Sequence, residues 1–400
     1  MTTEESSPVL RRSAPVAMAV AACLPWLALR ALGRAPDLPW TLVLPGLCIV
    51  GAAFMMTWAA EVLELDLPQN VAIGIVALIA VLPEYAVDMY FAWTAGRNPA
   101  YTAYATANMT GANRLLIGLG WPVVLLTFWW KSGERAISLS RDNAVELMAL
   151  LAATVYAFVL PLKRGLSCID SVVFLAIFAA YAYRSSQAHA GEPELEGTAA
   201  FLAELPPRPR RVAVAAIFLF AAVAIGLSAQ PFAEGILGEG RRWGIEEFLL
   251  VQWLAPLASE APEFIVAMVF ASRGKPEVGL RALVSSKVNQ WTLLVGMIPL
   301  AYCASAGGLS PMPLDERQAE EIVLTAAQSL FGLAFLIDLK FTIGEALALL
   351  VLFAAQMVFQ APGARWGFAG LYLVLSAGLF FRRGNGRSLR DLAAFALKTP

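Results

Sequence analysis

The sequence predicts an all-α polytopic membrane protein with about twelve transmembrane helices, and three features carry this prediction. The 400 residues are 59% hydrophobic and only 15% charged, whereas about 25% of residues are charged in a typical soluble domain. The apolar residues gather in runs of roughly 20, the length that crosses a bilayer. A segment of the first half also recurs in the second half. A soluble globular protein is therefore excluded.

Each apolar run lies between Gly, Pro and charged residues and predicts one helix. The first run follows Arg11 and Arg12, as in a signal peptide, but no clear small-residue cleavage site follows it before Pro36. We therefore expect this run to remain as a helix. In order, the predicted helices cover about 14–33, 39–60, 71–95, 103–129, 143–162, 167–184, 212–234, 246–271, 279–303, 320–338, 341–360 and 365–381.

The longest polar stretch, 185–211, contains glutamates, prolines and arginines and predicts a linker between two halves of the chain. With the N-terminus in the cytoplasm, the loops and tails on that side carry about twice as many basic residues as the outside loops, where Lys163 and Arg164 lie. This bias predicts that both termini and the linker are cytoplasmic. Short loops and an N-terminus unlike a transit peptide favour a bacterial inner membrane.

Composition also excludes several kinds of function. The net charge of -1 gives no basic excess for a nucleic-acid partner. The single histidine, His189, lies in a polar loop. No histidine is therefore available inside the membrane to ligate zinc or haem or to serve in a Ser-His-Asp triad. The four cysteines lie in or beside apolar segments without a CxxC pair, which favours buried thiols over disulfides or metal ligands.

The repeated segment ends at Pro122 in the first half and at Pro299 in the second. Pro83-Glu84 aligns with Pro262-Glu263, and the last part of both copies aligns without a gap. Equivalent positions lie five predicted helices apart, and an odd number of crossings inverts the second copy. The sequence therefore predicts two inverted five-helix repeats plus one extra helix at each end, a plan that is common in secondary transporters.

Glu84 and Glu263 lie near the middle of long apolar runs, where an ionisable group costs about 2.5 to 3.5 kcal/mol. The proline before each glutamate cannot donate a helical hydrogen bond, so a backbone carbonyl is freed one turn earlier. Carboxylate and carbonyl oxygens are ligands for hard cations such as Ca²⁺. Such a glutamate can also simply join two helices, but the symmetric pair favours a cation site.

Asp88 follows Glu84 by four residues, and Glu260 precedes Glu263 by three, so each shares a helix face with its neighbour. Four carboxylates are therefore expected to converge, and one of each pair can hold a proton near neutral pH in the absence of a cation. The alternative is that Asp88 or Glu260 faces a water-filled vestibule.

Ser259, Asn113 and Gln290 complete the predicted cation ligands, although amides and hydroxyls can equally join helices. Arg114 and Lys287 lie in the second helices of the two repeats. Their side chains either pair with the carboxylates, which weakens binding of a divalent cation, or extend to the membrane interface.

At these residues the chain resembles the sodium/calcium exchanger family of the cation/Ca²⁺ antiporter superfamily, whose repeats typically read like G-T-S-L-P-E and G-S-N. The counterparts here are A-V-L-P-E at 80–84 with G-A-N at 111–113, and A-S-E-A-P-E at 258–263 with V-N-Q at 288–290. The resemblance implies that a glutamate from each repeat, Glu84 and Glu263, binds the transported ion.

The resemblance also implies a domain plan. Segment 1–38 is a tail with an extra helix, 39–184 the first repeat domain, 185–211 the cytoplasmic linker, 212–360 the second repeat domain, and 361–400 an extra helix with a basic tail. Several family ligands are replaced: Ala80 and Val81 stand where hydroxyl residues are usual, and Leu116 and Leu293 where a second asparagine is frequent.

We therefore expect a membrane cation antiporter that exchanges Ca²⁺ or a related cation for Na⁺ or H⁺ by alternating access. The lost hydroxyls and additional acids favour H⁺. The alternative is a protein of the same fold, non-transporting or of altered specificity, whose ion site is closed by Arg114 and Lys287. An intramembrane enzyme needs a nucleophile or a metal cluster. Two carboxylates can serve as an aspartyl-type pair, but the repeat symmetry gives no reason to expect one, and no enzyme is expected. The expected partners are inorganic cations, as transported substrates, and the lipid bilayer, with no cofactor.

Overall fold

The computed structural model describes residues 8–66, 81–187, 195–381 and 385–398, and they are almost entirely helical. Within the described residues, the predicted apolar runs coincide with helices, most with boundaries that differ by a few residues, whereas the helix Pro207–Trp243 extends well beyond the run predicted at 212–234. The first part of the run predicted at 71–95 lies outside the described residues. Among the described residues, nine helices are long and apolar enough to cross a membrane, and Ile343–Val358 is a shorter apolar helix.

The chain divides into two compact units. The first unit contains Met1–Val87, His189–Ile245 and Ala258–Pro262, and the second contains the rest. The helices of the first unit are α1 (Pro8–Ala31), α2 (Trp40–Leu63), α10 (Gly197–Ala203) and α11 (Pro207–Trp243). The first unit also contains short parts of α4 (Leu82–Ala95) and α12 (Glu247–Ser272). Both helices that carry a Pro-Glu pair therefore contribute residues to both units.

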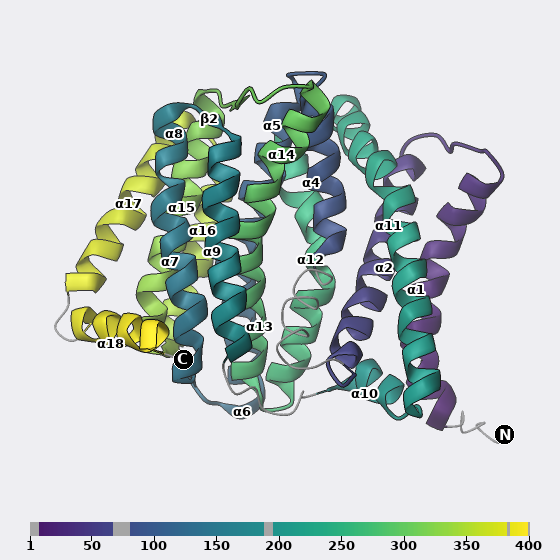
Figure 1. Ribbon diagram of the computed structural model, residues 1–400, viewed down its shortest axis with the longest axis horizontal. Coiled ribbons are helices and arrows are strands. Elements are labelled where there is room, and N and C mark those ends of the chain that lie inside the picture. Colours follow the sequence, from purple (N-terminus) through teal and green to yellow (C-terminus); the bar gives the residue numbers. More distant parts are fainter. Residues whose placement is uncertain (1–7, 67–80, 188–194, 382–384, 399–400) are drawn as a thin grey trace. The chain divides into compact units, whose positions relative to one another are not determined.

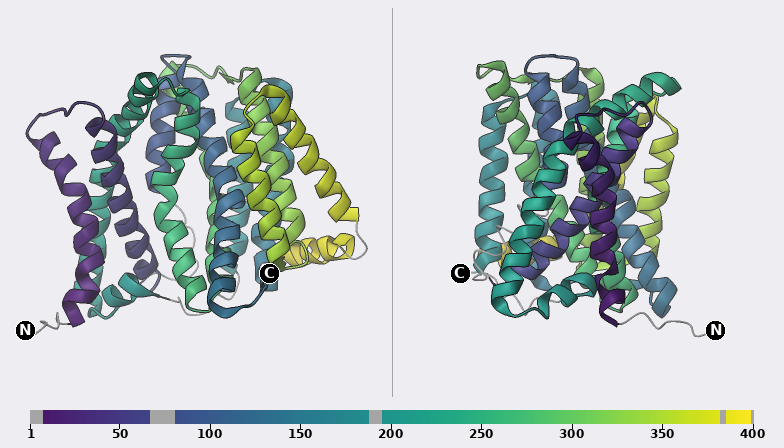
Figure 2. Two further views of the ribbon diagram at one scale, coloured as in Figure 1. Left: turned by 180° about the vertical axis from the view of Figure 1, so that it is seen from behind. Right: turned by 90° about the vertical axis from the view of Figure 1, so that its right-hand side faces the viewer.

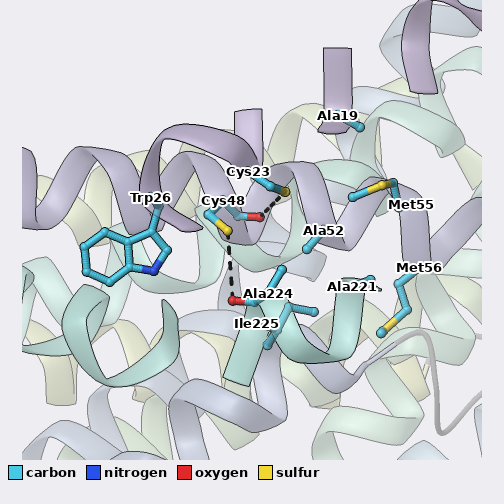
Figure 3. Close-up of a cluster of buried hydrophobic side chains, with 10 residues drawn as sticks. All are labelled: Ala19, Cys23, Trp26, Cys48, Ala52, Met55, Met56, Ala221, Ala224 and Ile225. Carbon is cyan, nitrogen blue, oxygen red and sulfur yellow. Dashed lines mark hydrogen bonds between the residues drawn. The ribbon is translucent and has the colours of Figure 1, made fainter. Parts of the chain in front are cut away.

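In the first unit, α2 packs against both α1 and α11 (Figure 1), and all three helices contribute to one buried cluster. Small side chains allow this close approach, as is common between membrane helices. The cluster in Figure 3 contains Ala19, Cys23, Trp26, Cys48, Ala52, Met55, Met56, Ala221, Ala224 and Ile225. Part of the predicted linker is helical here, because α10 and the first turn of α11 lie within 185–211.

The second unit contains the remaining helices, and α7, α9 and α15 lie side by side in it (Figure 1). After α4 these are α5 (Tyr101–Leu115), α6 (Trp121–Ser132), α7 (Ala144–Ala157), α8 (Val159–Lys163) and α9 (Cys168–Gln187). After α12 they are α13 (Pro276–Asn289), α14 (Val295–Ala306), α15 (Glu316–Leu336), α16 (Ile343–Val358), α17 (Pro362–Phe381) and α18 (Asn385–Lys398). The amphipathic α18, which the sequence reading placed in a tail, lies across the end of α7 (Figure 2).

Short strands join the loops of the two halves within the second unit. Strand β1 (Ala136–Ser138) pairs antiparallel with β4 (Lys340–Thr342), with Ile137 opposite Phe341. Strand β2 (Gly165–Leu166) pairs antiparallel with β3 (Met312–Pro313) at the other end of the helices. Each pair links a loop of the first half to a loop of the second.

The internal repeat has a structural counterpart. Helices α5 and α6 form one rod interrupted by a π-helical segment, Leu116–Gly120, and α13 and α14 form another interrupted at Gln290–Leu294. The two rods run in opposite directions (Figure 1), with α13 packed against α6. The predicted inversion of the second copy is thus confirmed. π-Helical interruptions of this kind often occur at functional sites.

Candidate cation site

The two Pro-Glu pairs lie at different places in their helices. Pro83 and Glu84 occupy the first turn of α4, and Glu84 is only 3% exposed. Pro262 and Glu263 lie in the interior of α12, which continues through them, and Glu263 is partly buried. In α12 the missing N–H of Pro262 leaves the carbonyl of Ala258 without its helical donor, as the sequence predicts.

Asp88 is fully buried on α4 and faces α5. Its Oδ1 accepts a hydrogen bond of 2.8 Å from Asn108 Nδ2. Within the described part of the chain, Asp88 Oδ2 and Asn108 Oδ1 are buried and make no hydrogen bond. A buried acceptor without a donor is costly, and carboxylate and amide oxygens are among the ligands that a hard cation takes.

Glu263 is held by the neighbouring helix α13. Ser286 Oγ donates a hydrogen bond of 2.6 Å to Glu263 Oε2, which fixes the orientation of the carboxylate. This contact and the Asp88–Asn108 contact join the first helix of each repeat to the second. The pattern is thus the same in both repeats, although the contacting residues do not occupy equivalent positions.

Lys287 is completely buried and contacts one of the predicted ligands. Its Nζ donates to Asn113 Oδ1 at 2.6 Å and to the Asn113 carbonyl oxygen at 3.1 Å, and it lies 4.6 Å from the centre of the Trp291 ring. Asn113 Nδ2 donates to the Met109 carbonyl oxygen at 2.8 Å. Of the two alternatives expected for Lys287, extension to the membrane interface is therefore wrong, because an ammonium with these contacts lies among the helices.

Arg114 is also buried, at 3% exposure, and does not extend to the interface either. Its Nη2 donates to Glu321 Oε2 on α15 at 2.5 Å, and its guanidinium lies 5.0 Å from the centre of the Trp253 ring. Gln252 Nε2 donates to the same Glu321 oxygen at 3.0 Å. Arg114 thus pairs with a carboxylate, which is one of the two alternatives expected. The carboxylate is that of Glu321, however, which is not among the predicted cation ligands.

Glu321 and its neighbour Glu320 are the residues that sequence reasoning missed. Glu320 Oε2 accepts from Arg365 Nε at 2.8 Å, and Glu320 Oε1 accepts from Trp366 Nε1 at 3.1 Å. The sequence signal was present, because both glutamates lie in an apolar helix, where an ionisable residue is a functional candidate by default. Because both glutamates stand at the start of the predicted helix 320–338, they were not recognised as residues inside the membrane.

The other predicted ligands lie on α12 and on the rod formed by α13 and α14. Glu260 and Ser259 are buried on α12, in its part that belongs to the first unit. Gln290 is buried and begins the π-helical segment of the second rod. By their chemistry alone, the predicted ligands offer carboxylate, amide and hydroxyl oxygens, which suit a hard cation rather than a soft metal. Within the described residues, no three acidic, histidine or cysteine side chains form a group that could hold a metal ion.

Comparison with known proteins gave one family and several similar structures. A profile described as sodium/calcium exchanger protein matches residues 38–187 and 213–361. A crystal structure of the H⁺/Ca²⁺ exchanger CAX is similar with 43% sequence identity and a TM-score of 0.94, over 98% of this chain and 99% of that one. A search of curated proteins gave no match.

Two more distant structures share the fold. The structure of native YfkE is similar with 15% identity and a TM-score of 0.62, over 88% of this chain and 98% of that one. The sodium–calcium exchanger NCX_Mj, soaked with Na⁺ and Ca²⁺, is similar with 17% identity and a TM-score of 0.53, over 80% of this chain and 97% of that one.

Proposed function

Because the chain belongs to the sodium/calcium exchanger protein family, and is thus a cation/Ca²⁺ antiporter by homology, we propose that it exchanges Ca²⁺ for H⁺ by alternating access. The observation that carries the choice of ions is the 43% identity to an H⁺/Ca²⁺ exchanger over 98% of the chain. The alignment with that exchanger covers both repeats of this chain, including the interrupted helices. The ions are substrates of transport, and no resident cofactor is part of the proposal.

In this proposal Glu84 and Glu263 are the principal Ca²⁺ ligands, because each is the ionisable residue of a Pro-Glu pair. Asp88 and Glu260 add carboxylate oxygens one turn away on the same helices, and Ser259, Asn113 and Gln290 are the supporting ligands. Asn108 and Ser286 hold two of the carboxylates in place.

One feature of the proposed site supports H⁺ rather than Na⁺ as the counter-ion. Neighbouring carboxylates in a desolvated site can share a proton when no cation neutralises them. In the proposed cycle, Asn113 Oδ1 ligates the cation only when its hydrogen bond from the Lys287 ammonium is broken.

The same contact favours the second candidate, in which the ion site is closed and the protein does not transport or has another specificity. An ammonium on a predicted ligand oxygen repels a divalent cation. Arg114 contributes less to this alternative, because Glu321 neutralises it. The closed-site alternative therefore depends on the Lys287 ammonium remaining beside Asn113.

Uptake of Ca²⁺ into proteoliposomes tests the proposal. An outward H⁺ gradient is expected to drive uptake, an outward Na⁺ gradient is not, and Glu84→Gln or Glu263→Gln is expected to reduce the rate at least tenfold. Glu277→Gln is the matched control, because Glu277 is an exposed glutamate on α13. Uptake driven by Na⁺ alone would refute the counter-ion, and uptake that survives both glutamine substitutions would refute the site. No uptake from folded protein would favour the closed-site alternative.

The membrane setting is a further part of the proposal. The basic loops support cytoplasmic termini and a bacterial inner membrane. In that orientation Ca²⁺ leaves the cytoplasm as protons enter, since protons are commonly more concentrated outside such a membrane.

A further inference from the structure

Two cysteines from different halves of the chain meet at one end of the second unit. Cys168 begins α9, and Cys303 lies in the last turn of α14, 135 positions later in the sequence. Their sulfur atoms are 3.3 Å apart. We propose that this thiol pair is a modification site, at which a two-electron thiol oxidant forms an intramolecular disulfide between α9 and α14.

The surrounding backbone holds the two sulfurs in place. Strand β2 ends two residues before Cys168 and is paired with β3, which follows Cys303 after a short loop. Cys303 Sγ also donates to the carbonyl oxygen of Ser310 in that loop, at 3.4 Å. Because both cysteines are anchored on each side, the sulfurs stay close, and little movement is needed to form the bond.

The packing of α9 against α14 reinforces this proximity. Gly296 on α14 lies so close to α9 that a Cβ atom there would be 3.2 Å from Phe174 Cβ. The helices are therefore in contact along their length and not only at the cysteines. A disulfide would fasten an existing contact rather than draw separate segments together.

The other two cysteines are also neighbours, and they provide an internal control because of their burial. Cys23 and Cys48 are both completely buried in the first unit. The sulfur of Cys23 is directed toward the carbonyl oxygen of Cys48, at 3.4 Å, and that of Cys48 toward the carbonyl oxygen of Ala224, at 3.9 Å (Figure 3). Cys168, in contrast, is partly exposed, so an oxidant can reach it.

The sequence places this end of the unit outside the cytoplasm, because the loop with Lys163 and Arg164 is predicted to be external. Thiols outside the cytoplasm meet disulfide-exchange proteins and low-molecular-weight disulfides, whereas cytoplasmic thiols stay reduced. The co-reactant is therefore a disulfide, which the cell envelope supplies.

The reaction balances as two thiol–disulfide exchanges. The thiolate of Cys168, the more accessible sulfur, attacks the oxidant disulfide, forms a mixed disulfide and releases one thiolate. The thiolate of Cys303 then attacks the Cys168 sulfur, forms the Cys168–Cys303 bond and releases the second thiolate. The two protons from the cysteines pass to the released thiolates, so two cysteines are oxidised and one disulfide is reduced to two thiols.

Oxidised glutathione tests the pair on the purified full-length protein, independently of transport. After oxidation, alkylation under denaturing conditions and non-reducing digestion, mass spectrometry is expected to find the Cys168 and Cys303 peptides joined and Cys23 and Cys48 alkylated. The Cys303→Ser variant is expected to retain glutathione on Cys168, because the second exchange cannot occur.

Thermal unfolding gives a second readout, because a cross-link restricts the unfolded chain. The oxidised wild type is expected to unfold several degrees above the reduced wild type, and Cys168→Ser is expected to show no such shift. Four alkylated cysteines after oxidation would overturn the proposal. A disulfide between two molecules, or one that involves Cys23 or Cys48, would also overturn it.

Discussion

The buried charges of the second unit show how a membrane interior accommodates ionisable side chains. Arg114 pairs with Glu321, and Arg365 pairs with Glu320, so two cations are neutralised by carboxylates from one helix, α15. Lys287 instead donates to amide and carbonyl oxygens of Asn113. The buried cations of this unit are thus held both by carboxylates and by neutral amide and carbonyl oxygens.

Removing one partner of the Arg114–Glu321 pair leaves the other charge buried without compensation. We expect Glu321→Gln to destabilise the protein by about 3 to 5 kcal/mol, and the double variant Arg114→Met/Glu321→Met to be more stable than Glu321→Gln. Thermal unfolding in detergent measures both. If Glu321→Gln unfolds at the wild-type temperature, the ion pair has no such structural role.

The hydroxyl of Ser286 orients the Glu263 carboxylate, and a hydrogen bond to a charged group contributes about 1.5 to 3 kcal/mol. We expect Ser286→Ala to raise the Ca²⁺ concentration for half-maximal uptake by about tenfold, while the protein still folds. Ser272→Ala is the control, because the exposed Ser272 on α12 bonds only the carbonyl of Val269 among the contacts described. Equal uptake curves for both variants would contradict this role.

At the scale of elements, the second helix of the first repeat touches the first helix of the second repeat through a glycine. A Cβ atom on Gly111 of α5 would lie 1.8 Å from the carbonyl oxygen of Gln252 on α12, so no larger residue fits without separating the helices. This contact also places Gln252 beside Thr110 and Glu321.

We therefore expect Gly111→Ala to lower the free energy of unfolding by about 1 to 3 kcal/mol. The matched control is Gly226→Ala in the interior of α11, where no atom lies within 4 Å of the new Cβ. That variant is expected to be neutral or slightly stabilising, because alanine has the higher helix propensity. Equal thermal unfolding of the two variants would show that α5 and α12 can separate at no cost.

A second contact between elements joins the end of α2 to the start of α11. Arg210 donates to both carboxylate oxygens of Asp66 at 2.9 Å, and Arg211 donates to Oδ1 at 2.9 Å. The bond from Arg210 is the main cause that lowers the pKa of Asp66, and Arg211 adds to it. The predicted linker thus contributes residues that fasten two helices of the first unit.

A lowered pKa in the folded state gives stability that is present above the unfolded-state pKa of about 3.9 and is lost as the pH falls through the folded-state pKa. We expect wild type to be more stable than Asp66→Asn by a constant amount above about pH 4, and this difference to shrink as the pH falls further. Asp391→Asn, at an exposed position on α18, is the control. Parallel curves for wild type and Asp66→Asn would refute this contribution.

At the scale of the whole molecule, the second unit has two distinct ends. The β1–β4 pair brings Arg135 and Lys340 to one end, and α13 begins beside it. The β2–β3 pair marks the other end, near Lys163 and Arg164. The loops that the charge bias assigns to the cytoplasm therefore gather at one end, as a membrane orientation requires.

Cysteine labelling tests this orientation. In a variant with all four native cysteines replaced by serine, Leu309→Cys is expected to react with a membrane-impermeant maleimide on intact cells. Arg273→Cys is expected to react only after lysis. Both positions are exposed, so burial does not explain a difference between them. The reverse pattern would place the termini outside the cytoplasm.

The extent of sequence prediction differs between fold and site. The twelve apolar runs and the inverted repeat were predictable because hydrophobicity and chain direction are local properties of the sequence. The helix α18 was missed because it is strongly amphipathic but too short and too polar to mark a membrane span. The partners of Arg114 and Asp66 were missed because they lie 207 and 144 positions away.

By itself, the sequence determined that the chain is helical, lies in a membrane, repeats itself in inverted form and carries two Pro-Glu pairs. Only the tertiary structure decided that Arg114 pairs with Glu321, that Lys287 donates a hydrogen bond to Asn113, and that the sulfurs of Cys168 and Cys303 lie side by side. The physical reason is that the membrane sets the length and polarity of each helix segment by segment, whereas the partner of a buried charge depends on which helices pack together.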